Sequence, residues 1–382
     1  MTTEESKQIE RIKGSEEFKG AEKQRDLLDF FAKRMGTPFG AADIEEHFYG
    51  CPAFHRDHKP GRSRVAVLEL RDRLARYRQA NADDKWLCRI AGEGQKEAYE
   101  LQLISSEQRP ASDVFWGAHL DKVSDVIAVC GDHLFFFDRR QKMAFRFYDL
   151  NADGTDEELR TALGHFYLRG DRSELLPLRN VYLATGEVQA FEMLQAWFHQ
   201  RSGILIRRVA SRDIRPEMVH RSSPILFGRP DTNRYMKGIF DSQEAKHLGY
   251  RMGKTYGSIE IRNVTPQEKE DLAPWGLEVT GKDGKLGPVK NWEHVFGVVT
   301  RIPNPSGYGF VTMISFHYYA KVTSQIVEAL TTDKLAAAVL AKMKWSVQRN
   351  LPGSFELLFA VRISPGNIEG EGVAELLGWR VR

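Results

Sequence analysis

The chain has 382 residues, of which 42% are hydrophobic and 28% charged, and its formal net charge is +3. This composition is typical of a soluble globular protein and excludes a largely disordered chain. The length is too great for one ordinary core and predicts two domains. No run of about 18 apolar residues appears and the first 20 residues are polar, so we expect a cytoplasmic protein without a membrane partner.

Three cysteines, Cys51, Cys88 and Cys130, lie far apart and form no Cys-x-x-Cys pair. An odd and scattered set argues against a disulfide framework and against a cysteine-built zinc site. No group of His, Asp and Glu has a spacing that requires a metal. We therefore expect reduced thiols and neither a metal nor a cofactor.

The first part of the chain predicts a polar arm and then two helices. Residues 1–20 contain hardly any apolar side chains and predict a disordered arm. Residues 22–35 predict a helix that ends at Gly36-Thr37-Pro38, and residues 41–48 predict a second, shorter helix. A domain is therefore expected to begin near residue 21.

The segment 62–78, RSRVAVLELRDRLARYR, predicts a helix with two different faces. Its apolar stripe consists of Val67, Leu70, Leu74 and Tyr77, and its arginines at seven-residue spacing are Arg64, Arg71 and Arg78. Between residues 56 and 78 there are eight Lys or Arg against three Asp or Glu. Such a helix suits a DNA duplex, because guanidinium groups bind phosphates and guanine edges, although a solvated surface helix has the same pattern.

Two predicted strands follow, at residues 86–90 and 98–103, with Gly92-Glu93-Gly94 between them. Three helices and then a two-stranded ribbon is the order of a winged helix-turn-helix, whose last helix enters the major groove. Arginines would bind phosphates, and residues near 63–67 would face bases. The predicted DNA contacts are Arg62, Ser63, Arg64, Val67, Arg71, Arg78, Lys85 and Arg89.

Residues 22–105 also resemble a known family, and the predicted DNA-binding domain covers residues 21–105. The residues that carry this resemblance are Phe48-Tyr49-Gly50, Phe54, Arg64-Val65, Leu70-Arg71, Leu74 and Tyr77. In these places the chain is similar to bacterial winged helix-turn-helix transcriptional regulators. The resemblance implies double-stranded DNA as the partner, and a homodimer, since such regulators read paired half-sites.

Residues 104–114 are polar and predict a linker, and residues 112–382 predict an α/β domain with a mainly parallel sheet. The predicted strands are 125–130, 133–137, 180–184, 203–209, 224–227, 256–261, 277–280, 296–302, 310–315 and 355–363. The predicted helices are about fifteen residues ending at Leu168, then 187–200, 213–219, 233–240 and 320–340. The strand, helix and strand between residues 180 and 209 indicate a parallel crossover.

Ligands of parallel sheets bind beyond the carboxyl ends of strands, and three such places contain polar residues. At the first, Thr185, Gly186 and Glu187, the threonine either caps a helix or contacts a ligand. The second contains Gly228, Arg229, Asp231, Thr232 and Asn233, and here Arg229 would hold an anionic group. The third is His317, whose alternative role is a hydrogen bond inside the core.

The second domain resembles the sensor domain of the same regulators. Gly228 and Asn233, Pro303-Asn304-Pro305, and the segment from Val311 to Tyr319 carry this resemblance. It implies a periplasmic-binding-like α/β domain that senses a small molecule or mediates assembly. The leading hypothesis is therefore a DNA-binding transcriptional regulator with a ligand-sensing domain.

Two alternatives remain open. The chain contains none of the GxSxG, HExxH, GxxxxGK[ST] or GxGxxG motifs. A carboxylate pair of Glu187 and Asp231 would suit a hydrolase or a nucleotide-processing enzyme that is recruited by its basic N-terminal part. The other alternative is a protein-interaction module in a bacterial signalling or defence system.

Overall fold

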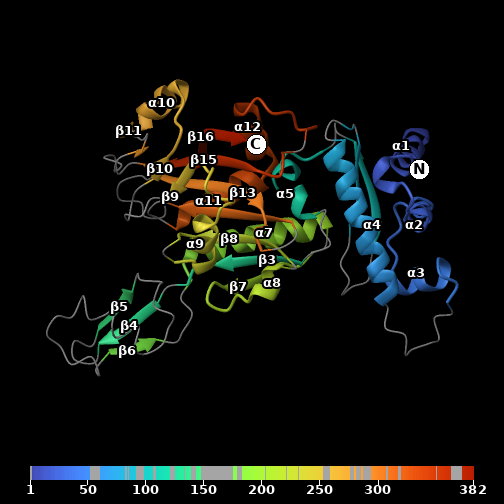
Figure 1. Cartoon of the computed structure of the whole chain (residues 1–382), viewed down its shortest axis with the longest axis horizontal. Coiled ribbons are helices and arrows are strands. Elements are labelled where there is room, and N and C mark those ends of the chain that lie inside the picture. Colours follow the sequence, from blue (N-terminus) through green and yellow to red (C-terminus); the bar gives the residue numbers. More distant parts are fainter. Residues whose placement is uncertain are drawn as a thin grey trace.

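The protein is of the mixed α/β class, and its computed structural model is shown in Figure 1. The structure describes residues 2–51, 61–81, 84, 86–91, 99–105, 109–120, 125–132, 134–138, 143–147, 175–178, 183–202, 204–220, 222–230, 232–252, 259–275, 279–280, 285–286, 294–306, 309–316, 320–349, 351–362 and 372–382. In this part of the chain, a helical module with a β-hairpin precedes a larger α/β domain.

The N-terminal module begins with a helix that the sequence did not indicate. Helix α1 (Thr3–Lys13) and a 3-10 turn (Glu16–Phe18) occupy the residues expected to form a disordered arm, so that prediction is wrong. Ile12 and Phe18 have no exposed surface. A few apolar side chains among many charges are enough here, because neighbouring helices complete their burial.

Three further helices complete the helical part of the module. They are α2 (Glu22–Ala32), α3 (Ala41–His47) and α4 (Gly61–Ala80), and they agree with the predicted helices. The predicted apolar stripe of α4 lies in the core, with Val67, Leu70, Leu74 and Tyr77 at most 3% exposed. They pack with Leu28 and Phe31 of α2 in one hydrophobic cluster.

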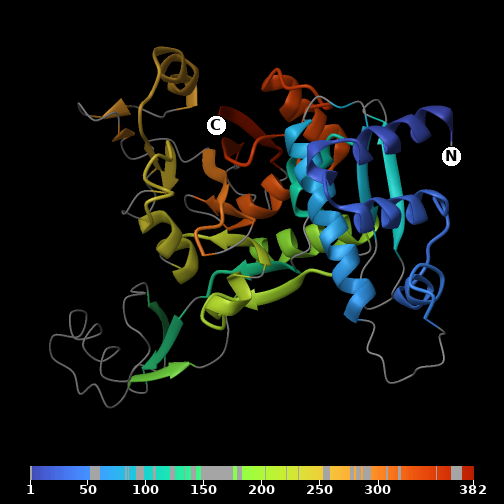
Figure 2. The same cartoon turned by 45° about the vertical axis from the view of Figure 1, so that its right-hand side comes forward.

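The hairpin consists of β1 (Trp86–Ala91) and β2 (Glu100–Ser105), paired antiparallel from Trp86 with Ser105 to Ala91 with Glu100. A residue between α2 and α3 extends this pairing: Phe39 N–H donates to Tyr99 O at 3.1 Å, and Tyr99 N–H donates to Phe39 O at 2.7 Å. Figure 2 shows the N-terminal helices packed beside the hairpin.

Helix α5 (Ser112–Leu120) occupies part of the predicted linker, which is a second correction. Asp113, Phe115 and Trp116 are at most 1% exposed. The sequence did not predict this helix, because its first residues are polar. Ser112 and Asp113 are nevertheless buried, since Ser112 bonds to Asp333 and Asp113 pairs with Arg89, and both partners are distant in sequence.

The α/β domain is built on a seven-stranded sheet with the order β16-β15-β13-β14-β8-β3-β7. Its strands are β3 (Asp125–Cys130), β7 (Arg207–Ala210), β8 (Ser222–Gly228), β13 (His294–Pro303), β14 (Phe310–Phe316), β15 (Phe355–Arg362) and β16 (Ala374–Val381). Parallel pairing joins β14, β8, β3 and β7, whereas the other pairs are antiparallel. The sheet is therefore mixed, and the expectation of a mainly parallel sheet holds for one half of it.

Both faces of the sheet are covered. Ala128 and Cys130 of β3 face a cluster that includes α5, α7 (Thr185–Ser202), α11 (Lys321–Thr331) and α12 (Asp333–Lys342). Ile127 and Val129 face the cluster of α9 (Arg234–Asp241). Burial on both faces explains why the strand is apolar at every position from Val126 to Cys130. The predicted helix 320–340 is divided in two at Thr332.

Shorter elements complete the domain. They are α8 (Pro216–His220), α10 (Pro266–Leu272), a 3-10 turn (Ala273–Trp275), β9 (Tyr250–Met252), β10 (Ile259–Ile261), β11 (Val279–Thr280) and β12 (Lys285–Leu286). The hairpin of β9 and β10 and helix α10 cover the antiparallel half of the sheet through Tyr250, Ile259 and Leu272.

The segment between β3 and α7 forms a separate sheet. Strands β4 (Leu134–Asp138), β5 (Met143–Phe147) and β6 (Leu175–Leu178) pair in the order β5-β4-β6, apart from the main sheet in both views (Figures 1 and 2). Strand β7 pairs in parallel with β3, and residues 180–182 of the strand predicted at 180–184 lie outside the described residues. The predicted helix that ends at Leu168 lies outside the described residues.

Candidate nucleic-acid interface

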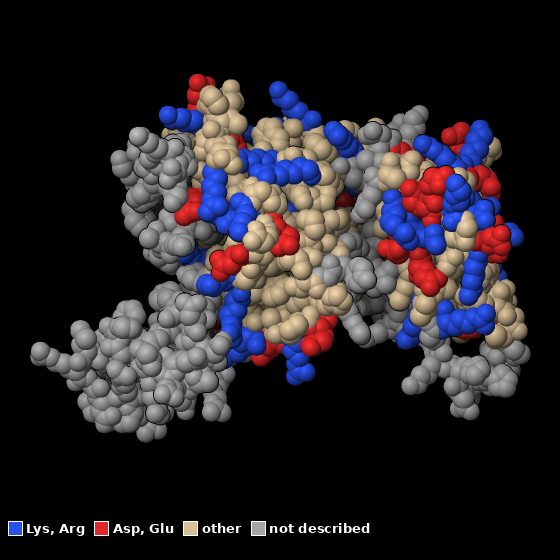
Figure 3. All heavy atoms as spheres, in the orientation of Figure 1, with Lys and Arg blue, Asp and Glu red and all other residues tan. Residues whose placement is uncertain are grey.

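The exposed charges of helix α4 are divided along its length. Arg62, Arg64 and Val65 are exposed in its first two turns. Further along, the Asp72 carboxylate pairs with Arg76 at 2.8 Å, and Glu69 accepts a hydrogen bond from Gln24 at 2.5 Å. The basic surplus of the helix therefore lies at its N-terminal end. On the face of the module that Figure 3 shows, basic and acidic side chains are intermixed.

Two cationic side chains lie over the ring of Tyr49, beside the N-terminal end of α4. The guanidinium of Arg62 lies 4.0 Å from the centre of the Tyr49 ring, and Lys23 Nζ lies 5.0 Å from the same centre. Tyr49 follows α3, Lys23 belongs to α2, and Arg62 belongs to α4. A cation over an aromatic face is attracted by the ring quadrupole. Three elements thus hold positive charge at one place.

Two of the arginines spaced by seven have a different role. Arg71 Nε–H donates to Ile90 O and Arg78 Nη2–H donates to Cys88 O, both at 3.1 Å. The carbonyls of Cys88 and Ile90 point to the same side of β1, because they are two residues apart on a strand. In the described part of the chain, β2 is the one strand that pairs with β1, so the opposite edge of β1 has no strand beside it. The arginines therefore join α4 to the other side of the hairpin and cover an edge that would attract further strands.

Burial removes four predicted residues from the candidate DNA-contact surface. Ser63, Val67, Arg78 and Arg89 are 0%, 1%, 9% and 5% exposed. The N–H of Ser63 donates to the Glu45 carboxylate at 2.8 Å, which caps the start of α4. Burial, with the charges of Arg109 and Arg89, lowers the pKa of Arg78 to about 9.

The remaining predicted contacts are Arg62, Arg64, Arg71 and Lys85. The first two are exposed and Arg71 is half-buried, while Lys85 lies outside the described residues. Val65, which directly follows Arg64, is 53% exposed and was not among the predicted contacts. Its position three residues after Arg62 was the available signal, because residues three or four apart share a helix face.

Arg89 joins the hairpin to the α/β domain. Its Nη1 lies 3.3 Å from the Asp113 carboxylate, its Nε–H donates to Gln102 Oε1 at 2.9 Å, and its Nη2–H donates to Arg201 O at 3.2 Å. Burial lowers the pKa of Arg89, and Asp113 opposes that shift. The hairpin is thus connected through charged groups to α5 and to the last turn of α7.

A second carboxylate extends this junction. Ser112 Oγ–H donates to Asp333 at 2.6 Å, and Arg201 Nη2 lies 2.8 Å from the same carboxylate. Trp197 Nε1–H donates to Ser112 Oγ at 2.9 Å. Partial burial would raise the pKa of Asp333, but the hydrogen bonds from Ser112 and the charge of Arg201 lower it overall.

At the carboxyl ends of β3 and β8, the structure brings together several of the predicted ligand-binding residues. Glu187 is fully buried and its carboxylate accepts the N–H of Gly131 at 2.7 Å. A Cβ at Gly131 would lie 2.9 Å from Thr232 Oγ1, and one at Gly228 would lie 3.1 Å from Glu187 Oε1. Gly228 also has a φ of +111°, which favours glycine. Gly131 and Gly228 therefore leave the space that the buried Glu187 carboxylate occupies.

Asn233 accounts for much of the polarity in its loop. Its Oδ1 accepts the N–H of Met236 at 3.1 Å and thereby caps α9. Its Nδ2 donates to Phe227 O at 2.9 Å and to Val129 O at 3.3 Å, which joins the ends of β8 and β3. Arg229 is 4% exposed, and its N–H donates to Thr232 Oγ1 at 3.1 Å. Each of these contacts serves the fold.

The first loop also has a packing role. A Cβ at Gly186 would lie 2.1 Å from Ala320 O, so this glycine permits close contact between α7 and the start of α11. Thr185 is exposed and is the first residue of α7. Asp231 and His317 lie outside the described residues, and so does any geometry of the Glu187 and Asp231 pair.

Comparisons with known proteins give no relative: no family, no curated protein and no solved structure matches this chain. Among the described residues, no group of three or more His, Cys, Asp or Glu is arranged to hold a metal ion. No described helix combines the length and apolarity needed to cross a membrane.

Proposed function

We propose that the protein is a DNA-binding transcriptional regulator in which residues 21–105 form a winged helix-turn-helix, with α4 as the recognition helix. The α/β domain would sense a small molecule or mediate assembly, and a homodimer would place two α4 helices on paired half-sites. Because α1 packs on the same core, the folded module would begin at residue 3.

The observation that carries this proposal is the pairing of Phe39 with Tyr99. It adds a short extended segment between α2 and α3 to the β-hairpin that follows α4. From α2 onward, the resulting order is helix, one bridged residue, two helices and a hairpin. This order supports a winged helix, since it places the helix before the hairpin as the recognition helix and joins the segment between α2 and α3 to the hairpin.

The surface of α4 supports the same function. Arg62 and Arg64 would bind phosphates or guanine edges at the N-terminal end of the helix, where recognition helices contact bases. Val65 would contact the methyl group of thymine. Lys23 would contact the DNA backbone beside these residues, since Lys23 and Arg62 both lie over the ring of Tyr49.

Fluorescence anisotropy with a labelled 30-base-pair duplex of mixed sequence, over about 50 to 200 mM salt, tests this proposal. The double variant Arg62→Ala/Arg64→Ala should weaken binding by about tenfold or more. It should also reduce the slope of log Kd against log salt by about 2, since each lost phosphate contact removes about 0.9.

The matched control removes two exposed cations from the other domain: Lys246→Ala/Lys342→Ala. It should bind DNA like the wild type. If the Arg62→Ala/Arg64→Ala protein is folded and retains wild-type affinity at about 0.1 M salt, the assignment of α4 as the recognition helix is wrong.

A further inference from the structure

The small sheet of β4, β5 and β6, which we call the arm sheet, lies apart from the main sheet of the α/β domain. Figure 1 shows it beyond the lower edge of the domain with no described helix beside it, and Figure 2 shows the same separation from the main sheet. The main sheet differs, because helices cover both of its faces.

The register of the arm sheet assigns its residues to two faces, because alternate residues of a strand lie on opposite sides of a sheet. Phe136 is opposite Phe145 of β5 and Pro177 of β6. The first face accordingly contains apolar residues from all three strands: Leu134, Phe136, Phe145, Phe147, Leu175 and Pro177. Its one charged position is Asp138, the last residue of β4. A sheet face of this composition must be buried against another element.

The second face of the arm sheet is also largely apolar. It contains Phe135, Phe137 and Leu176, and Arg146 is opposite Phe135. An apolar run on both faces is typical of a strand that is covered on both sides, as β3 is in the main sheet. The arm sheet therefore needs two covering elements.

The connection from β5 to β6, residues 148–174, lies outside the described residues. Its sequence has one apolar stripe, in which Leu159, Leu163 and Phe166 are spaced by four and three residues, and this pattern predicts a single amphipathic helix. One such helix is enough for one face of the arm sheet. The other face remains for a partner.

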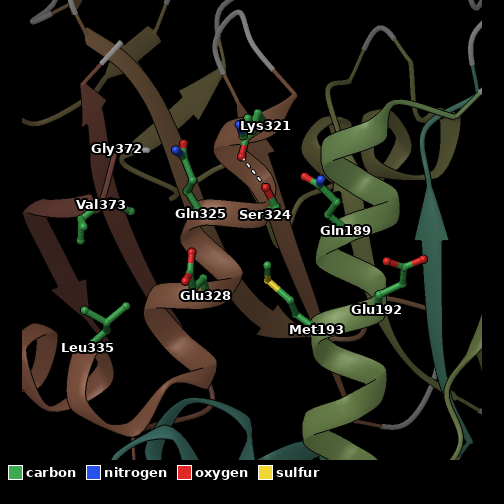
Figure 4. A pocket seen from close by; sticks show the side chains of 11 residues that line it. Gln189, Glu192, Met193, Lys321, Ser324, Gln325, Glu328, Leu335, Gly372 and Val373 are labelled. Atoms are coloured by element: carbon green, nitrogen blue, oxygen red, sulfur yellow. Dashed lines mark hydrogen bonds between the residues drawn. The ribbon is translucent and has the colours of Figure 1, made fainter. Parts of the chain in front are cut away.

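The other apolar residues on the surface of the described chain are scattered. The large ones are Val65 on α4, Leu205 ahead of β7, and Val373 and Trp379 near the two ends of β16. A groove of about 450 Å³ between α7 and α11, shown in Figure 4, has Gln189, Glu192 and Glu328 among its lining residues. Neither feature offers the apolar centre that is typical of a homodimer interface.

We propose that the first face of the arm sheet packs against the same face of a second copy of this chain. The two sheets then form a sandwich with a spacing of about 10 Å. Each of the three phenylalanines buries about 150 Å² or more when covered, so that with Leu134, Leu175 and Pro177 the face reaches roughly the 800 Å² per partner of a standard interface.

Charge selects the first face over the second. A two-fold axis places the same surface of both copies in contact. Packing through the second face would bring Arg146 near Arg146 of the other copy, and like charges repel each other. Packing through the first face leaves both arginines on the outer sides of the sandwich. The homodimer is part of the proposed function, and the arm sheet supplies its surface.

Size-exclusion chromatography with light scattering, on the full chain without DNA, tests this interface. The wild type should have twice the mass of one chain. Phe136→Glu should weaken dimerisation by about a hundredfold, because it places a charge in the centre of an apolar interface. The matched control Val373→Glu changes a residue that is 65% exposed in the same domain and should leave the mass unchanged.

Photo-crosslinking decides the question even if Phe136→Glu does not fold. Phe136→p-benzoylphenylalanine keeps an aromatic side chain and should give a covalent dimer on irradiation, whereas Val373→p-benzoylphenylalanine should give none. Absence of the covalent dimer from position 136, or a folded Phe136→Glu protein that is still a dimer, would overturn the assignment and leave the proposed homodimer to another surface. A monomeric wild type would overturn both, and would mean that the same chain covers both faces.

Discussion

The Arg89 guanidinium lies 3.3 Å from the Asp113 carboxylate, and both residues are at most 5% exposed. Arg89 belongs to the hairpin and Asp113 to α5, so the pair connects the N-terminal module to the α/β domain. Arg201 of α7 lies 3.5 Å from the other oxygen of Asp113. One carboxylate thus compensates two arginines at this junction.

Replacing Asp113 with Asn should destabilise the protein by about 3 to 5 kcal/mol, because Arg89 then remains buried without a counter-charge. Urea unfolding followed by circular dichroism measures this change. The control is Asp72→Asn, which removes an exposed i,i+4 pair on α4 and should cost about 0.5 kcal/mol or less. Equal effects of the two substitutions would show that the junction contributes little.

Replacing Arg78 with Ala should lower stability by about 1 to 3 kcal/mol, since the Cys88 carbonyl loses its donor and the arginine stem leaves the core. Arg64→Ala, two repeats earlier at an exposed position, should change the unfolding free energy by about 0.5 kcal/mol or less. In the DNA titration the order of the two effects should reverse: Arg64→Ala should weaken DNA binding, and Arg78→Ala should leave it unchanged. A stable Arg78→Ala protein with a reduced salt slope would contradict the structural role.

Replacing Asn233 with Asp should separate its two functions. Aspartate still caps α9, but it loses both donors to Phe227 O and Val129 O and places a negative charge beside those carbonyls. We expect a loss of about 3 kcal/mol in urea unfolding. The matched cap substitution Thr265→Asp on α10, at an exposed site, should be nearly neutral. A neutral Asn233→Asp would mean that only the cap matters.

Asp333 should contribute to the acid sensitivity of the fold. Its pKa in the folded protein is below the ordinary value of 3.8, so the unfolded chain takes up this proton more readily. The stabilisation is present above that ordinary value and is lost as the pH falls through the folded pKa. Asp333→Asn should therefore be less stable than the wild type near neutral pH, with a smaller difference at about pH 3. Asp213→Asn, an exposed control, should keep the wild-type pH profile.

How far the sequence predicted the fold depended on whether each pattern was local. The stripe of α4 and the apolar runs of β3 and β14 follow the periods of a helix and of a strand buried on both faces, and these elements were placed correctly. Helix α1 and helix α5 were missed, because their buried faces contain polar residues whose partners lie far along the chain.

In the candidate site, too, local patterns were predictable from the sequence and contacts between distant residues were not. The local charge surplus indicated α4 as a DNA-binding helix, and exposure of Arg62 and Arg64 keeps that proposal open. The seven-residue spacing of Arg71 and Arg78 could not distinguish phosphate contacts from hydrogen bonds to β1, since both use the same donors.

The sequence by itself determined which segments form helices and strands with strong periodicity, and where positive charge is concentrated. The tertiary structure decided which charged groups are buried, because burial depends on elements that meet only after folding. It placed Arg78 and Arg89 inside and left Arg62 and Val65 outside. It also gave Glu187 and Asn233 roles in joining strand ends, which no local pattern contains.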